Sequence, residues 1–385
     1  MGVDLENQVK RAAWRVGPFR IKSTLFFNEA GFDSNIYRGT ASESVKDYTF
    51  TAGPGLNIYL PLKKKVVFSI YESPQYVHYF QTERERSWNN YLSGKVHFIL
   101  NKFFITAGWG HSSARQRWNT EIDIRPRRKE ESLSGSLLWQ FSKRISYFLS
   151  FRKLQYDYES ISYEDFNLAE RLNRKENYLN LTTYYQISYR TRFFADLEYS
   201  RYNFESLSSS KDSRSHAAYG GFDFSPTGRV RGRIHIGYKT FDVLDPRAQD
   251  YKGIVGDTQI SIKAFRLLSL RTSYRRNIQF SLWYDNNYYL EKVLGAGASF
   301  YLFRKIRLDY DTFAGRNHYP NIGEFGTLAR QEREDLYRIH SAGIYFKVRK
   351  GAGLGVVFSH WVRDSNLDSK DAKRNFIGLN LTYDF

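Results

Sequence analysis

Residues 375–385 read NFIGLNLTYDF, and their side chains alternate between apolar and polar. The apolar positions of this stretch are Ile377, Leu379, Leu381, Tyr383 and Phe385. The positions between them carry small or polar side chains, namely Gly378, Asn380, Thr382 and Asp384. A period of two residues places the two sets on opposite faces of a β-strand. One face of this strand therefore needs an apolar environment and the other a polar one.

The stretch resembles the closing strand of a bacterial outer-membrane β-barrel, which ends on an aromatic residue and carries apolar or aromatic side chains at alternate positions. A terminal aromatic residue preceded by apolar residues at alternate positions resembles the signal that the barrel-insertion machinery recognises in such proteins. The resemblance implies that the apolar set faces lipid and the polar set faces a lumen. It also implies a location in the outer membrane of a Gram-negative bacterium.

The composition of the chain agrees with a barrel. Its mean hydropathy is −0.58, and no run of about 18 apolar residues occurs, so a membrane-spanning helix is not expected. Aromatic residues nevertheless make up 17% of the chain, which is too many for a disordered protein. A barrel satisfies both observations, because only alternate strand residues are apolar and aromatic side chains gather at the two membrane interfaces.

The chain contains no cysteine, which excludes disulfides, thiolate catalysis and covalent haem attachment. It begins MGVDLENQ, without the charged and then apolar segment of a secretion signal. Since an outer-membrane protein needs such a signal, we expect this start to be processed or engineered. The formal net charge is +18, which indicates an acidic partner or ligand.

Alternating segments recur along the chain, joined by short turns and long polar loops in turn. Counting them predicts about eighteen strands, an even number as bacterial barrels require, with sixteen as the alternative. We predict an all-β, transmembrane, antiparallel up-and-down barrel over residues 17–385, with residues 1–16 as a periplasmic segment. The short turns are expected to be periplasmic and the long loops extracellular. A soluble sandwich or propeller fits less well, because it would need Gly/Pro-rich turns of comparable length at both ends, and the chain has only 8 Pro.

One long loop shows helical rather than alternating spacing. Phe166, Leu168 and Leu172 lie at helical intervals within residues 159–177. We therefore expect a short helix in this extracellular loop.

Lysines and arginines of the predicted strands fall on the polar face. In residues 230–239, for example, Arg231, Arg233 and Lys239 alternate with apolar side chains. A lysine or arginine facing lipid near mid-membrane would cost about 2–4 kcal/mol, so these cations are predicted to face the lumen. The predicted lumen-facing cations are Arg20, Lys22, Lys95, Arg152, Arg192, Arg231, Arg233, Lys239, Lys263, Arg271, Arg275 and Arg307.

Such a lumen would enrich anions, because positive charge on low-dielectric walls focuses the field. Arginine can hold carboxylates and phosphates by its bidentate fork, and inward aromatic rings could stack on sugars. The candidate sugar-stacking residues are Tyr59, Tyr71, Tyr91, Tyr178 and Tyr184. Alternatively, the cations only fill space and pair with carboxylates such as Glu198, Asp309 and Asp311. The group predicted to have few acidic neighbours is Arg231, Arg233, Lys239, Arg271 and Arg275.

Residues 17–38 and 48–79 carry two further patterns. The first pattern contains Phe32, Asp33, Asn35, Ile36 and Tyr37. The second contains Pro54, Gly55 and Leu56, followed by a basic turn at 63–65. Over roughly residues 15–100 these patterns resemble a family of outer-membrane barrels found with exopolysaccharide synthesis clusters, called putative β-barrel porin 2. The resemblance implies a conduit for a secreted polysaccharide, and no catalytic residue carries over.

Three other functions stay open at this point. An uptake porin for small anions or oligosaccharides would use the same lumen, and a long loop folded into the bore, at 112–131, 159–176 or 315–334, would favour it. A barrel enzyme would need a triad with defined geometry, which eight scattered histidines do not supply. A sheath around a cytochrome has no specific support.

The remaining expectations concern partners. Residues 125–129 (RPRRK) are interpreted as loop charges that meet lipopolysaccharide phosphates. If the protein is a conduit for a polysaccharide, we also expect a periplasmic polysaccharide-export partner. Zinc-ligand spacing and a phosphate-binding glycine loop are missing, so no metal, cofactor or enzymatic activity is expected. Nucleic acid is not expected, because a barrel encloses the cations, and a monomer is favoured.

Overall fold

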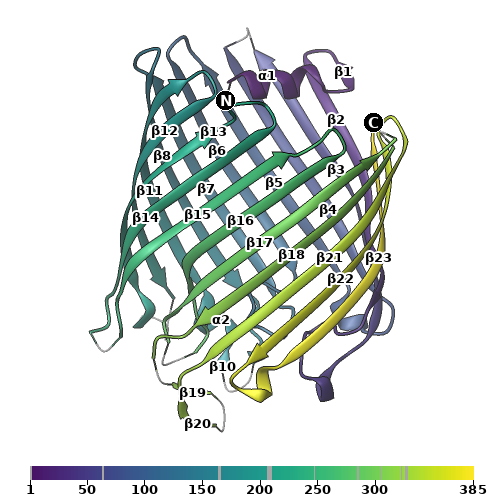
Figure 1. Cartoon of the computed structure of the whole chain (residues 1–385), viewed down its shortest axis with the longest axis vertical. Helices are drawn as coiled ribbons and strands as arrows, with labels where there is room; N and C mark the ends of the chain where they lie inside the picture. The colour runs from purple at the N-terminus through teal and green to yellow at the C-terminus, as the bar shows by residue number, and fades with distance from the viewer. Residues whose placement is uncertain are drawn as a thin grey trace.

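The computed structural model describes residues 2–385 except 63–64, 164–165, 206–209, 247, 284–285, 304, 322 and 326–327. In this part of the chain, eighteen long strands form one closed antiparallel barrel (Figure 1). Each barrel strand pairs with the next, and β2 (Phe19–Asp33) pairs with β23 (Ala372–Asp384) to close the wall. The strands between them are β3 (Asp47–Leu62), β4 (Val66–Tyr79), β5 (Ser87–Ile99), β6 (Phe103–Arg115), β7 (Arg127–Gln140), β8 (Ile145–Tyr158), β11 (Arg174–Ser188), β12 (Thr191–Phe204), β13 (Ser213–Phe224), β14 (Val230–Val243), β15 (Tyr251–Lys263), β16 (Leu268–Phe280), β17 (Tyr288–Leu302), β18 (Ile306–His318), β21 (Glu334–Arg349) and β22 (Ala352–Ser365).

The predicted barrel and its strand number are confirmed. Both termini lie at the end where the connections are short, which we call the turn end; the opposite end is the loop end (Figure 1). The helix expected within residues 159–177 is α2 (Leu168–Leu172), and the Asn167 side chain caps it by accepting a hydrogen bond from the Ala169 amide. Residues 63–64 of the basic turn lie outside the described residues. Small elements in the other loops are η1 (Ala41–Glu43), η2 (Glu83–Glu85), β9 (Ser162–Tyr163), β10 (Phe166–Asn167), β19 (Gly323–Phe325), β20 (Leu328–Gln331) and η4 (Asp368–Lys370).

Side chains alternate across the wall with the predicted period. In β23, Ile377 and Leu379 are 52% and 46% exposed on the outer face, whereas Phe376 is 6% exposed on the inner face. A band of exposed apolar side chains on the outer wall is what contact with lipid tails requires.

The N-terminal segment contains α1 (Gly2–Lys10) and β1 (Trp14–Val16), which pairs with β2. Leu5 of α1 is buried against Tyr59 and Val67, two inward-facing residues of β3 and β4. The Tyr59 hydroxyl donates to Oε1 of Gln8 at 3.4 Å. α1 therefore lies against the inner wall at the turn end and covers Tyr59. Among the described residues, no helix is long and apolar enough to cross a membrane.

The wall changes at the loop end between β15 and β16. Their pairing ends at Gly256 and Arg276, although both strands continue beyond these residues. Past this point Phe280 packs with Phe241, an inward-facing residue of β14, at a ring-centroid distance of 5.9 Å. Tyr288 of β17 joins the same buried cluster. The ends of β16 and β17 therefore fold inside the barrel and carry their connecting loop into the lumen.

Candidate functional site

A cavity of about 920 Å³ lies along the inner wall near the turn end. Its lining includes five arginines and two carboxylates, so positive charge is in excess. The charged residues of this lining are Arg190, Arg192, Arg231, Arg233, Arg271, Asp223 and Asp311. We call it the turn-end cavity.

Ion pairs hold most of these cations in place. Arg192 lies 2.8 Å and Arg233 3.8 Å from Asp223. Arg271 lies 2.8 Å from Asp311. No ion pair of Arg231 or Arg190 is found within the described residues, and Arg190 donates to the Pro226 carbonyl oxygen at 3.3 Å, which leaves Arg231 and Arg190 as the members of this set without a carboxylate partner.

The prediction that the candidate cation group has few acidic neighbours is wrong for four of its five members. Arg233 and Arg271 pair as described, Lys239 lies 3.4 Å from Glu198, and Arg275 lies 2.8 Å from Glu291. Adjacent strands are only about 4.8 Å apart, so acids far away in sequence come within reach. The structure also separates the group, because Lys239 lines a different cavity from Arg231.

The Arg271–Asp311 pair depends on a glycine between them. Gly297 of β17 is in register with Arg271 on β16 and with Asp311 on β18. A Cβ at this position would lie 2.0 Å from Oδ1 of Asp311. The missing side chain therefore lets the two charged groups meet across an intervening strand.

The other predicted lumen residues are spread along the wall. Lys22 lies 3.6 Å from Asp384 and Arg307 lies 2.9 Å from Asp309. Arg20 donates to the carbonyl oxygens of Gly17 and Phe19. Arg152 stacks over Tyr178 at 4.8 Å and Arg192 over Tyr184 at 4.3 Å. No ion pair of Lys95 or Lys263 is found in the part of the chain that the structure describes.

A second cavity, of about 640 Å³, lies toward the loop end. Tyr71 and Tyr91, two of the candidate sugar-stacking residues, line it. The arginines of this cavity were not among the predicted site residues. Four of them lie in loops or at a strand end, where the alternation of residues does not show which way a side chain faces. The arginines that line the cavity are Arg38, Arg115, Arg117, Arg125 and Arg374.

The interpretation of residues 125–129 as lipopolysaccharide-binding loop charges is wrong for two of them. Arg125 lines the second cavity, 3.5 Å from Glu85. Arg128 lies over the Trp118 ring at 3.4 Å and pairs with Glu130 at 2.8 Å. Arg128 faces inward because β7 begins at Arg127 and alternation already applies to it, whereas Arg125 lies in the preceding loop, which folds into the barrel.

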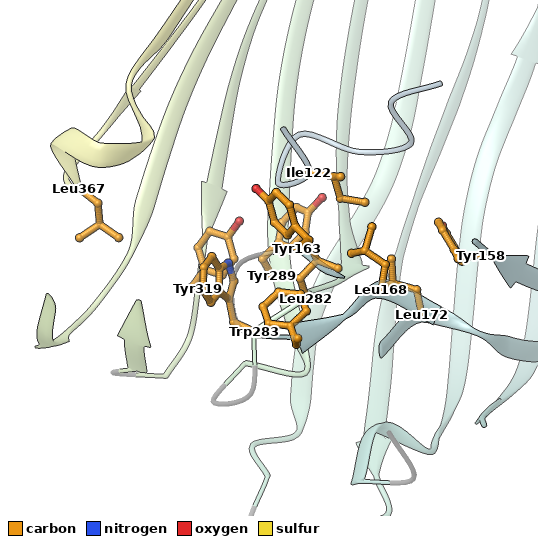
Figure 2. Close-up of a cluster of buried hydrophobic side chains, with 11 residues drawn as sticks. Ile122, Tyr158, Tyr163, Leu168, Leu172, Leu282, Trp283, Tyr289, Tyr319 and Leu367 are labelled. Carbon is orange, nitrogen blue, oxygen red and sulfur yellow. The ribbon is translucent and has the colours of Figure 1, made fainter. Parts of the chain in front are cut away.

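Long loops fold across the lumen at the loop end. A single buried apolar cluster extends from Tyr158 at the end of β8 to Leu367 after β22, two strands that lie nearly opposite each other around the barrel (Figure 2). Leu168 of α2 and Leu282 of the β16–β17 loop are both 0% exposed within it. A continuous core between opposite walls obstructs the lumen at this level.

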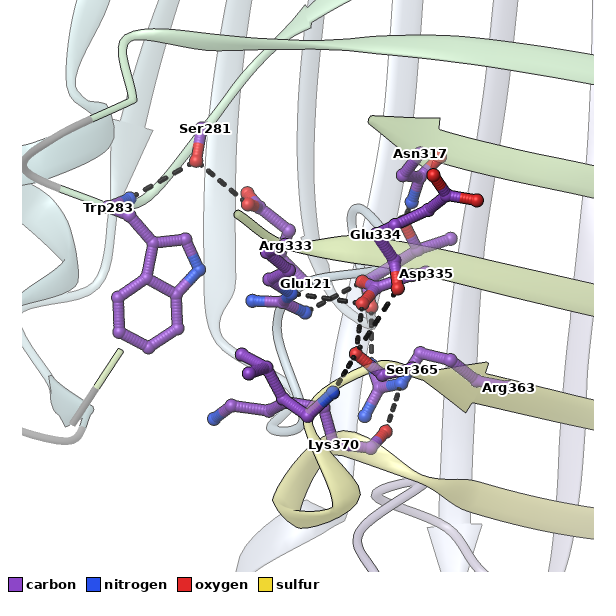
Figure 3. Close-up of polar contacts among 12 residues, drawn as sticks. Glu121, Ser281, Trp283, Asn317, Arg333, Glu334, Asp335, Arg363, Ser365 and Lys370 are labelled. Atoms are coloured by element: carbon purple, nitrogen blue, oxygen red, sulfur yellow. Dashed lines mark hydrogen bonds and ion pairs between the residues drawn. The ribbon is translucent and has the colours of Figure 1, made fainter. Parts of the chain in front are cut away.

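The loop of residues 116–126 crosses this closure, and we call it the crossing loop. The Glu121 carboxylate accepts hydrogen bonds from Ser281 Oγ at 2.8 Å and from the Leu282 amide at 3.0 Å. Asp123 pairs with Arg363 of β22 at 3.0 Å. Figure 3 shows the Glu121–Ser281 contact and, near it, the hydrogen bonds from Ser365 to Asp335 and from Arg363 to the Lys370 carbonyl oxygen. The loop is thus tied both to the opposite wall and to β22.

Buried charge accompanies the closure. Burial raises the pKa of Glu121, and the charge of Arg333 works against that rise. Burial lowers the pKa of Lys211 to about 7, with Arg171 acting in the same direction. The Lys211 ammonium donates to the Ser281 carbonyl at 2.5 Å. Ionisable groups whose pKa is shifted by burial make the closed state sensitive to pH.

The chain belongs to the family described as putative beta-barrel porin 2, whose model matches residues 132–385. The match does not include residues 15–100, whose sequence patterns also resemble this family. The molecule is a porin-like outer-membrane β-barrel channel. No curated protein is similar enough to count as a relative.

Similar solved structures are porins of the same architecture. A BenF-like porin from Pseudomonas fluorescens Pf-5 is 10% identical, with a TM-score of 0.55, over 96% of this chain and 99% of that one. OpdK from Pseudomonas aeruginosa, solved with vanillate, is 11% identical, with a TM-score of 0.53, over 95% and 98%. OccK3 from the same organism is 12% identical, with a TM-score of 0.52, over 99% and 97%. At these identities the likeness establishes the fold.

Proposed function

We propose that this protein is an anion-selective channel of the Gram-negative outer membrane that admits small acidic solutes, including acidic oligosaccharides, from outside. The observation that supports it most strongly is the crossing loop, which closes the loop end above a cationic lumen. An inward-folded long loop is the feature expected of an uptake porin rather than of a wide polymer conduit.

The charge of the lumen supports the anion preference. Arg231 and its paired neighbours Arg233 and Arg271 line the turn-end cavity, and positive charge on low-dielectric walls raises the local concentration of anions. Cations that are partly neutralised by Asp223 and Asp311 bind anions weakly enough to release them. A series of weak sites is what permeation requires.

Export of an anionic exopolysaccharide is the second candidate. It is favoured by the position of the turn-end cavity, where a polymer coming from the periplasm would enter. This function would need displacement of the crossing loop and a periplasmic polysaccharide-export partner at the turn end. Surface polymer that is lost and accumulates in the periplasm of a deletion strain would favour export. A normal polymer and lost growth on an acidic nutrient would favour uptake.

Anion selectivity is tested in planar bilayers with a salt gradient. The triple variant Arg231→Ser, Arg233→Ser, Arg271→Ser should shift the reversal potential toward cation preference, because it leaves Asp223 and Asp311 uncompensated. A control variant, Arg201→Ser with Arg214→Ser, removes cations from the outer faces of β12 and β13 and should leave the potential unchanged. A reversal potential that is equal in all three proteins would contradict the proposal.

A further inference from the structure

The second cavity contains an arginine whose charge is not balanced. No carboxylate lies within ion-pair distance of Arg38 in the described part of the chain, whereas Arg374 pairs with Asp33 at 2.8 Å and Arg117 with Asp123 at 3.1 Å. Burial and the charges of Arg117 and Arg374 hold the pKa of Arg38 well below its usual range. Positive charges of neighbouring arginines therefore converge where Arg38 lines the cavity.

The backbone around Arg38 is built to hold this position. Arg38 has φ +58°, a left-handed conformation that is costly for a residue with a side chain. The buried Asn35 amide fixes the turn by donating to the carbonyl oxygens of Gly39 at 2.8 Å and Lys373 at 3.0 Å. The side-chain oxygen of Asn35, Oδ1, in turn accepts a hydrogen bond from the Gly39 backbone amide at 3.1 Å. Strain held by a buried hydrogen-bond network points to a functional position.

An aromatic ring fixes the guanidinium itself. The carbon at the centre of the Arg38 guanidinium lies 4.5 Å from the centre of the Trp361 ring, which is 1% exposed. The guanidinium groups of Arg117 and Arg363 lie 5.9 Å and 5.7 Å from the same ring. Stacking immobilises the planar fork of Arg38 before any ligand arrives, which lowers the entropy cost of binding.

Besides its arginines and the carboxylates of Glu29 and Asp33, the cavity offers neutral hydrogen-bonding groups and aromatic rings. Gln75, Asn89 and Asn380 line it with side-chain amides, and Tyr71 and Tyr91 line it with aromatic rings. Amides and tyrosines suit the hydroxyl groups and flat faces of a sugar, and its volume of about 640 Å³ lies within the usual range of ligand pockets, about 300–1,000 Å³.

We propose that this cavity is a binding site for a carboxylate-bearing sugar, with the carboxylate on Arg38 and the ring against the tyrosines. The inference rests on the proposed function, because it names the solute class that an anion channel of this kind would select. The crossing loop and the inner faces of β2 to β5 both contribute to the lining of this cavity.

Titration calorimetry on the full chain in detergent micelles tests the site, with glucuronate as the probe and glucose as the neutral comparison. Arg38→Gln should weaken glucuronate binding by about tenfold or more, the usual effect of losing one charge-assisted hydrogen bond. Arg38→Gly should do the same, and it keeps the fold testable because glycine adopts the left-handed turn without strain. Arg201→Gln, on the outer face of β12, should bind glucuronate as the wild type does.

Three results would overturn the inference. Wild-type protein that binds no glucuronate would do so, as would Arg38 variants that bind it with unchanged affinity. Inorganic phosphate bound as tightly as glucuronate would indicate a general oxyanion site and refute the assignment to a sugar. Bilayer recordings on the same preparations separate the two proposals: anion selectivity without glucuronate binding defeats only this inference, and binding without selectivity defeats the channel proposal.

Discussion

Replacing Glu121 by alanine should release the crossing loop and open the loop end. The Glu121 side chain is 1% exposed and accepts two hydrogen bonds, at 2.8 Å from Ser281 and 3.0 Å from Leu282. Alanine would leave both donors buried without an acceptor, which costs about 1–3 kcal/mol each. Removal of a buried charge offsets part of this cost. We expect the closed state to lose about 2 kcal/mol, a shift of roughly thirtyfold toward the open state.

Single-channel recording in planar bilayers measures this shift as a longer open time or a larger conductance. Glu121→Gln, which keeps an acceptor oxygen, should fall between wild type and Glu121→Ala. Glu334→Ala is the matched control, because Glu334 lies at the same end and pairs with Arg316 on the outer side of the wall. If Glu121→Ala and Glu334→Ala both conduct as the wild type does, the crossing loop does not close the channel.

Two further predictions concern the effect of pH on closure and the role of the N-terminal helix. In the closed state, burial lowers the pKa of Lys211 to about 7, whereas in the open state a solvated lysine keeps its proton up to about pH 10.4. The open state therefore binds more protons above pH 7, and raising the pH should favour closure. Burial raises the pKa of Glu121, so its carboxylate is protonated at a higher pH in the closed state than when it is solvated. Lowering the pH should therefore also favour closure. Open probability recorded against pH should therefore pass through a maximum, and a monotonic profile would refute this assignment. At the other end, removal of residues 2–12 uncovers Tyr59 and Val67, which α1 now covers. Conductance should rise in the truncated protein, with heat-modified gel mobility as the check that the barrel has folded, and an unchanged conductance would mean that α1 does not narrow the bore.

The barrel itself could be predicted from the sequence because its cause is local. Each side chain of a strand faces opposite to its neighbour, so Ile377 and Leu379 specify a lipid face and Asn380 an inner face without reference to any other strand. Turn length then separates the two ends. The helix at Leu168–Leu172 was predictable for the same reason, since its spacing lies within one loop.

The charge balance of the lumen could not be predicted in this way. Arg271 and Asp311 are 40 positions apart and meet only because Gly297 on the strand between them lacks a side chain. The alternation of residues along one strand does not show which residues of the neighbouring strands lie beside it. The expectation of an unpaired cation group failed for that reason.

The sequence by itself determined an alternating wall, the approximate number of its strands and the end that carries the long loops, because strand period and turn length are properties of neighbouring residues. Only the tertiary structure decided that loops obstruct the lumen and where its unbalanced charge lies. Glu121 reaches Ser281 across the lumen, and Arg38 reaches Trp361 because closure of the sheet brings β2 beside β23 and β22. Contacts across a lumen depend on which strands stand opposite, and that follows from the barrel as a whole.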